Sequence, residues 1–235
     1  MSPALPSGLV VRGFAPPLRL ADFRLAAFDM DSTLIDIECI DEIAAAVGLK
    51  AEVAAITEAT MRGQIADFKE SLRRRVALLE GVAEKWLHEI WEHRLHLNPG
   101  VETFLEALRA AGLKTLLVSG GFTFFSDRVA QRLAIDYTRA NVLEIVDGKL
   151  TGRVVAQAWG DICDGAEKRR MLLQTCASLG IAPAQAIAVG DGSNDLPMMG
   201  EAGLSIAYHA QPAVREQAML AINAGGMDDA LAVLR

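Results

Sequence analysis

The sequence has little cysteine and no excess of positive charge. Its three cysteines, Cys39, Cys163 and Cys176, lack the spacing of a disulfide framework, so we expect free thiols in a reducing compartment. Lys and Arg number 23 and Asp and Glu number 30, which gives a formal net charge of −7. Nucleic acids and anionic membranes both attract a cationic protein surface, so this balance argues against either as a partner.

The sequence also lacks targeting and membrane-spanning segments. The N-terminus has no basic region followed by a long apolar stretch, and several prolines interrupt it. Residues 171–190 carry no charge, but Gly180 and Pro183 break them into a helix and a strand. We therefore predict a soluble, cytoplasmic protein.

Short apolar runs alternate with amphipathic segments of helix length. The runs cover residues 25–28, 115–118, 186–189, 204–207 and 220–222. Between them, apolar residues recur with helical spacing, as at Val101, Phe104 and Leu108. Strands that are apolar almost throughout are typical of a parallel sheet buried on both faces. The pattern predicts an α/β fold, a parallel sheet with helices on both faces.

One long stretch interrupts this alternation. Residues 40–96 show only helical periodicity, which predicts a helical cap inserted into the core. The predicted catalytic core is then made of residues 24–39 and 97–235. Residues 1–23 are rich in proline and are expected to form a loosely ordered arm. Further along the chain, Asp147-Gly148 predicts a hairpin turn between two short strands within 141–155.

Acidic residues, hydroxyls and glycines follow three of the predicted strands. These strand ends are Asp29-Met-Asp-Ser-Thr33, Ser119-Gly-Gly121 and Gly190-Asp-Gly-Ser-Asn-Asp195. Ligands bind beyond the carboxyl ends of parallel strands, so the three ends are expected to converge on one site. Asp29 and Asp31 lie two residues apart and should project to the same side of an extended strand end. With Asp191, they suit a hard cation, above all Mg²⁺.

Three further residues have both a functional and an ordinary interpretation. Ser119 and the glycines after it could receive a phosphoryl oxygen, or could simply form a tight turn. Lys168, on the inner stripe of a helix, faces an anion or extends outward to solvent. Arg75 shares the apolar stripe of a cap helix with Leu72, a position in which a guanidinium usually has an anionic partner.

Several segments together resemble the phosphoserine phosphatases of the haloacid dehalogenase-like superfamily. They are FDMDST (28–33), IDEIA (40–44), SLRRRV (71–76), VSGGF (118–122), DGKLTG (147–152) and VGDGSND (189–195). The resemblance covers the chain from about residue 24 to the C-terminus. It implies a Rossmann-like core, a four-helix cap inserted after the first core strand, and dependence on Mg²⁺.

The resemblance also implies a role for each matching residue. Asp29 would be the nucleophile and Asp31 the general acid and base. Mg²⁺ would be held by Asp29, the Asp31 carbonyl and Asp191. The phosphoryl group would be bound by Ser119, Gly120, Lys168 and Asn194, with Asp195 orienting Lys168. The serine moiety would be recognised by Glu38, Arg75 and Phe68, with Arg74 as the rival if the register is shifted by one.

The implied reaction is hydrolysis of O-phosphoserine to serine and phosphate through an aspartyl-phosphate, the last step of serine biosynthesis. Two alternatives remain open at this stage. One is a related phosphotransferase to an alcohol such as homoserine, or a phosphatase for another small ester. The other is a phospho-accepting signalling domain of receiver type.

We expect a monomer or homodimer. We also expect no feedback control through an N-terminal domain, because only about 23 residues precede the core.

Overall fold

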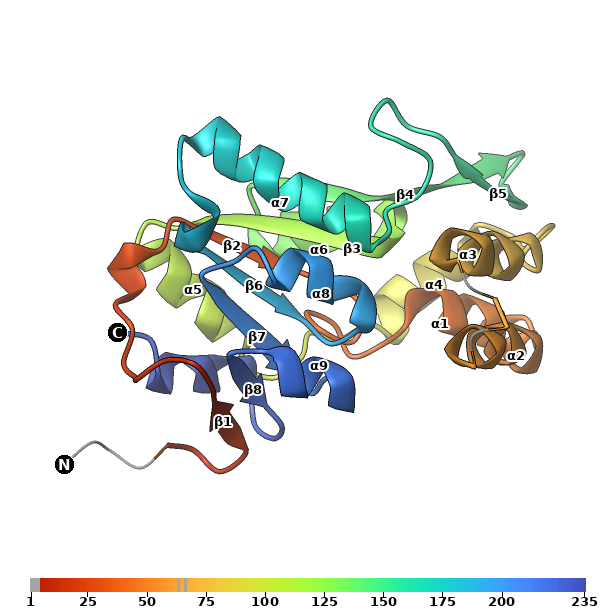
Figure 1. Cartoon of the computed structure of the whole chain (residues 1–235). Coiled ribbons are helices and arrows are strands. Elements are labelled where there is room, and N and C mark those ends of the chain that lie inside the picture. Colours follow the sequence, from red (N-terminus) through yellow and green to blue (C-terminus); the bar gives the residue numbers. More distant parts are fainter. Residues whose placement is uncertain (1–4, 63, 66) are drawn as a thin grey trace.

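The computed structural model describes residues 5–62, 64–65 and 67–235, and its centre is an eight-stranded sheet (Figure 1). The strand order is β1-β8-β7-β6-β2-β3-β4-β5. The strands are Leu9–Val11 (β1), Leu25–Phe28 (β2), Lys114–Phe122 (β3), Tyr137–Val146 (β4), Lys149–Val155 (β5), Ala186–Gly190 (β6), Leu204–Tyr208 (β7) and Leu220–Ile222 (β8). The pairs from β8 to β4 are parallel, and the edge strands β1 and β5 are antiparallel to their neighbours.

Helices cover both faces of this sheet. The helices of the described residues are Cys39–Ala46 (α1), Lys50–Met61 (α2), Phe68–Ala77 (α3), Lys85–His93 (α4), Val101–Ala110 (α5), Thr123–Leu133 (α6), Gly165–Leu179 (α7), Leu196–Met199 (α8) and Pro212–Gln217 (α9), of which α5–α9 cover the sheet. Ala26 and Phe28 of β2 pack with α5 and α6, whereas Leu25 and Ala27 pack with α7, α8 and α9. All four residues are fully buried, as expected of a parallel strand. The predicted α/β fold is confirmed.

The helices α1–α4 form the cap that interrupts the core between β2 and α5. Figure 1 shows them gathered beyond one end of the sheet. Their apolar faces, with Ile43, Leu72 and Leu87 among them, are continuous with the core on the α5 and α6 face of the sheet. The cap is therefore packed onto the core as well as connected to it by the chain.

The hairpin β4–β5 braces the cap from a second side. Asp147 and Gly148 form its two-residue turn, and both have positive φ (50° and 70°), as primed turns require. This confirms the hairpin predicted from Asp147-Gly148. Backbone hydrogen bonds join β5 to the segment after α3, from Gly81 N–H to the Leu150 carbonyl and from Leu150 N–H to the Val82 carbonyl, each at 2.8 Å.

The N-terminal segment differs from its expectation as an arm. From Leu9 it is part of the core sheet, because β1 pairs with β8 in the register Leu9↔Ile222. Further along, Leu18 N–H bonds the Val233 carbonyl at 2.8 Å and Phe23 is buried. A three-residue strand has no periodicity of its own, so its pairing depends on β8, more than 200 residues away in the chain.

A second difference concerns Ser119-Gly120-Gly121, which was expected as a turn after its strand. The segment lies inside β3, which runs on to Phe122, and it forms an irregularity in the pairing with β4. Glycine in a strand often marks such a bulge.

In the part of the chain that the structure describes, no helix has the length and apolar character needed to cross a membrane.

Phe104 of α5 supports the strand that leads into the catalytic edge. Its ring packs edge-on against Phe28 with centroids 6.2 Å apart, and both residues are fully buried. We expect Phe104→Ala to lower the free energy of unfolding by about 3–5 kcal/mol, through lost burial and a cavity. Urea denaturation measures this. The exposed Glu106→Ala on the same helix should change it by less than about 0.5 kcal/mol; equal losses would contradict the packing argument.

Candidate active site

A cavity of about 610 Å³ lies between the cap and the carboxyl ends of the core strands. Nine residues singled out from the sequence line it: Asp29, Asp31, Glu38, Phe68, Arg75, Ser119, Gly120, Asp191 and Asn194. The core supplies the acidic residues and the Ser-Gly segment, and the cap supplies Phe68 and Arg75. The fold thus brings four distant parts of the chain to one cavity.

Three carboxyl groups cluster at the core side of this cavity. One ligand oxygen from each of Asp29, Asp191 and Asp195 lies within 4.8 Å of the others. The set predicted for the metal was Asp29, Asp31 and Asp191, so the structure adds the carboxylate of Asp195. Among the residues that the structure describes, the Asp31 side chain is outside this cluster.

Lys168 lies behind the acidic cluster rather than in the cavity wall. It is fully buried, and its Nζ is 2.7 Å from Asp29 Oδ1 and 2.7 Å from Asp195 Oδ1. Burial alone would lower the pKa of Lys168, but the charges of Asp195 and Asp29 outweigh burial and raise it. The lysine is therefore a permanent cation at neutral pH.

One ammonium does not neutralise three carboxylates. Burial and the nearby Asp195 raise the pKa of Asp29, and the same two causes raise the pKa of Asp191 to about 7. Carboxylate oxygens without a nitrogen or sulfur donor are the ligands of hard cations. The excess negative charge and the all-oxygen donor set both fit a metal ion at this cluster.

Backbone and side-chain hydrogen bonds hold the cluster in place. Asp195 Oδ2 accepts from the N–H groups of Asp191 (3.2 Å) and Gly192 (3.1 Å). A Cβ at Gly190 would lie 2.4 Å from the Asp195 carboxyl, so only glycine fits there. Thr33 Oγ1 donates to Asp191 Oδ1 at 3.0 Å. Thr33, which belongs to the same motif as Asp29, was not predicted as a site residue.

The Asp31 carboxyl reaches the cavity from a different direction. Its Oδ2 accepts from the Cys39 N–H at 3.3 Å, and its Oδ1 is buried without a hydrogen-bond partner among the described residues. Burial and the charge of Glu38 raise the pKa of Asp31 to about 8. The group is therefore able to carry a proton at neutral pH and has one oxygen free to exchange it.

Glu38 stands at the start of α1, where the chain enters the cap. Ser32 Oγ donates to Glu38 Oε1 at 2.6 Å, and Ser32 itself has a left-handed backbone (φ 55°). Burial raises the pKa of Glu38. Strained backbone in a non-glycine residue is found most often at functional sites, and here it places a hydroxyl against a carboxylate that lines the cavity.

The structure distinguishes Arg75 from Arg74. Arg75 is half-buried and lines the cavity, and its Nε is buried without a partner among the described residues. Arg74 is exposed and pairs with Glu70 at 2.7 Å on the outer face of α3. Arg75 is the one that can meet an anionic group in the cavity.

The Ser119-Gly120 segment faces the cap across a narrow gap. Ser119 is buried, and its Oγ accepts from the Gly121 N–H at 2.8 Å. A Cβ at Gly120 would lie 3.1 Å from Phe68 Cζ. Glycine at this position therefore lets the cap ring approach the backbone closely.

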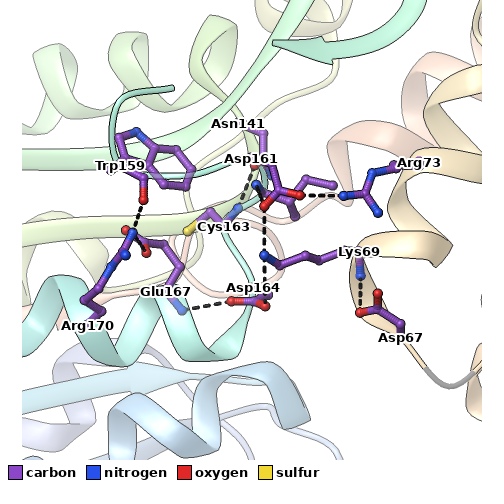
Figure 2. Close-up of polar contacts among 11 residues, drawn as sticks. Asp67, Lys69, Arg73, Asn141, Trp159, Asp161, Cys163, Asp164, Glu167 and Arg170 are labelled. Carbon is purple, nitrogen blue, oxygen red and sulfur yellow. Dashed lines mark hydrogen bonds and ion pairs between the residues drawn. The ribbon is translucent and has the colours of Figure 1, made fainter. Parts of the chain in front are cut away.

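Ion pairs hold the cap helix α3 against the core next to Phe68. Figure 2 shows Lys69 and Arg73 pointing to Asp161, in the loop before α7. Lys69 Nζ is 2.8 Å from Asp161 Oδ1 and 3.8 Å from Asp164 Oδ2. Because these groups are partly exposed, each pair contributes little alone, but together they join the two sides of the cavity.

The sequence matches haloacid dehalogenase-like hydrolases over residues 23–203. It is 69% identical over 225 residues to a phosphoserine phosphatase of Albidiferax ferrireducens, covering 96% of this chain and 95% of that relative. Two solved structures share 35% identity over 91% of this chain and 99% of theirs. They are a phospho-aspartyl intermediate analogue of phosphoserine phosphatase, with a TM-score of 0.83, and a substrate-bound phosphoserine phosphatase, with a TM-score of 0.82.

The raised carboxyl pKa values predict how the metal-free protein responds to pH. Above about pH 5 the unfolded chain has released nearly all of the Asp31 and Asp191 protons, whereas the folded chain keeps them up to a pKa of about 8 and about 7. The free energy of unfolding should therefore fall by roughly 1–3 kcal/mol from about pH 5.5 to about pH 6.5.

Urea denaturation in the presence of a chelator, repeated at several pH values, measures how the free energy of unfolding changes with pH. Asp191→Asn should make this dependence shallower, and adding Mg²⁺ to the unaltered protein should restore stability at the upper end of the range. A stability that rises with pH in chelator would contradict the charge argument.

Proposed function

Because the chain belongs to the haloacid dehalogenase-like hydrolases, and to the phosphoserine phosphatases among them, we propose that it hydrolyses O-phosphoserine to serine and phosphate through a phospho-aspartyl intermediate. The observation that carries this proposal is the arrangement of the cavity. Asp29 stands at one side, paired to Lys168, and Glu38 and Arg75 stand at the cap side. A small substrate with a phosphoryl group at one end and an amino acid at the other suits this pattern of charge.

In the first half of the reaction, Asp29 is the nucleophile. One of its carboxylate oxygens attacks phosphorus, and the bond from phosphorus to the serine oxygen breaks. Asp31 gives its proton to that leaving oxygen, so serine departs as the neutral alcohol. The pairing with Lys168 favours the ionised form of Asp29 that the attack requires.

In the second half, the aspartyl-phosphate is hydrolysed. Asp31, now ionised, takes a proton from the attacking water as the new bond to phosphorus forms. The bond between phosphorus and Asp29 breaks, which frees phosphate and regenerates the carboxylate. Ser119, Gly120 and Asn194 would bind the phosphoryl oxygens, and the positive charge of Lys168, behind Asp29, would stabilise them during both transfers.

The acidic cluster would hold Mg²⁺. We assign it to the carboxylates of Asp29 and Asp191 and to the carbonyl of Asp31, with Asp195 fixing Lys168 and the Asp191 loop. When bound, the ion neutralises charge on the phosphoryl oxygens and helps to keep Asp29 ionised. The three free cysteines suit the cytoplasm as the compartment in which the enzyme works.

The cap would recognise the serine end of the substrate. Glu38 would accept from the ammonium group, and Arg75 would donate to the carboxylate, with Phe68 packing beside them. These three residues favour turnover of a small molecule over a phospho-accepting signalling role. A receiver that only stores a phosphoryl group needs no residues that recognise an amino acid.

Asp29→Asn should lower kcat for phosphoserine by at least about a thousandfold, because an amide is a poor nucleophile. The phosphate released measures turnover. Phosphoserine that is radiolabelled in its phosphoryl group should, after acid quenching, leave label on the unaltered protein as the phospho-aspartyl intermediate, but not on the variant. Asp127→Asn, an exposed change on α6, is the control and should keep full activity. Near-normal turnover of a folded Asp29→Asn protein would disprove the nucleophile assignment.

Arg75→Ala should lower kcat/KM for phosphoserine by about a hundredfold or more, because the substrate carboxylate loses its half-buried cationic partner. With phosphoethanolamine, which lacks the carboxylate, the same variant should lose less than about threefold. Arg74→Ala is the matched control and should be close to normal with both. Equal losses of Arg75→Ala on the two substrates would mean that Arg75 only supports the cap.

A further inference from the structure

A buried asparagine lies behind the segment that is proposed to bind the phosphoryl group. The strands β3 and β4 pair in the register Val118↔Arg139 and then Phe122↔Asn141. Three residues of β3, 119–121, therefore stand opposite one residue of β4, Ala140. This bulge removes Ser119, Gly120 and Gly121 from the regular ladder of hydrogen bonds with β4.

The Asn141 side chain replaces the bond that the bulge removes. Its Nδ2 donates to the Gly120 carbonyl at 2.7 Å. Its Oδ1 accepts from the Cys163 N–H at 2.8 Å, the contact drawn in Figure 2. The residue is fully buried and does not line the cavity. Both ends of the amide are used, each toward a different segment of the backbone.

The second of these segments leads directly into the helix that carries Lys168. Cys163 is followed by Asp164, whose side chain caps α7 by accepting from the Glu167 N–H at 2.8 Å. The Lys168 N–H in turn bonds the Asp164 carbonyl at 2.9 Å. The start of α7, and with it the lysine, is therefore held in a fixed relation to Cys163.

We propose that Asn141 is a positioning residue that sets the distance between the Ser119-Gly120 backbone and Lys168. This inference rests on the proposed function, in which the Ser119-Gly120 segment binds the phosphoryl oxygens and Lys168 stabilises their charge. A buried donor must meet the Gly120 carbonyl and a buried acceptor must meet the Cys163 N–H, because unpaired buried polar groups are costly. Among residues of this size, asparagine supplies both. Aspartate keeps the acceptor but places a second oxygen against the carbonyl.

The test compares Asn141→Asp with a change that costs hydrogen bonds elsewhere in the same strand. Thr115, at the opposite end of β3, is buried and exchanges hydrogen bonds with Asp136, donating from Oγ1 to Oδ2 at 3.0 Å and accepting from its N–H at 3.1 Å. Thr115→Val therefore loses buried hydrogen bonds without touching the bulge. For both variants we would measure Tm, kcat and KM for phosphoserine, and the inhibition constants of inorganic phosphate and of serine.

Asn141→Asp should raise the inhibition constant of phosphate about tenfold or more and lower kcat by a similar factor, as is usual when a supporting residue of a site is lost. Its inhibition constant for serine should stay within about twofold, because the cap residues are untouched. Thr115→Val should lower Tm but leave all four constants near normal.

Three results would overturn the inference: unchanged constants for phosphate, constants for phosphate and serine that rise together, or equal effects of the two variants. If Asn141→Asp does not fold, Asn141→Ala, which removes both side-chain bonds without adding a charge, is measured in the same way. Failure of the proposed function is a separate result, since it would show in the unaltered protein as an absence of phosphoserine hydrolysis.

Discussion

The buried ion pairs of Lys168 are the interaction on which the catalytic edge depends. An ammonium without solvent is costly unless it is paired, and so is each of the two carboxylates that it meets. Lys168, Asp29 and Asp195 come from α7, from the end of β2 and from the loop after β6, and they satisfy one another at 2.7 Å. Because Asp195 uses its other oxygen for the N–H groups of Asp191 and Gly192, the lysine indirectly positions the Asp191 loop as well.

In the proposed function, the two parts of the molecule divide the recognition of the substrate between them. The core presents its groups at the ends of parallel strands, where rigid backbone holds them, and these groups suit a phosphoryl ester. The cap side presents Glu38, directly before α1, and Phe68 and Arg75 of α3, and these suit an amino acid. The hairpin β4–β5 and the pairing of Lys69 with Asp161 hold the two parts together, so the cavity exists only when the cap is packed onto the core.

Much of the fold follows from patterns within short stretches of chain. The apolar runs at 186–189, 204–207 and 220–222 match strands to within one residue, and the Asp147-Gly148 turn is where its sequence placed it. The failures are of another kind. The strand β1 was missed because three apolar residues carry no period, and β8 alone gives them a partner. The bulge at 119–121 was taken for a turn, because glycines favour both and only the register with β4 separates them.

The chemistry of the site can be read from the residues alone: acids, hydroxyls and glycines at three strand ends, a helical insertion between two of them, and motifs that match one family of phosphatases. Which of these groups meet depends on how the segments pack. This packing placed Asp195 rather than the Asp31 side chain in the acidic cluster, set Lys168 behind that cluster, turned Arg75 inward and Arg74 outward, and put Asn141 under the bulge. The physical reason is that residue types and spacing describe each segment alone. Distances between segments arise only when helices and sheet pack into one core.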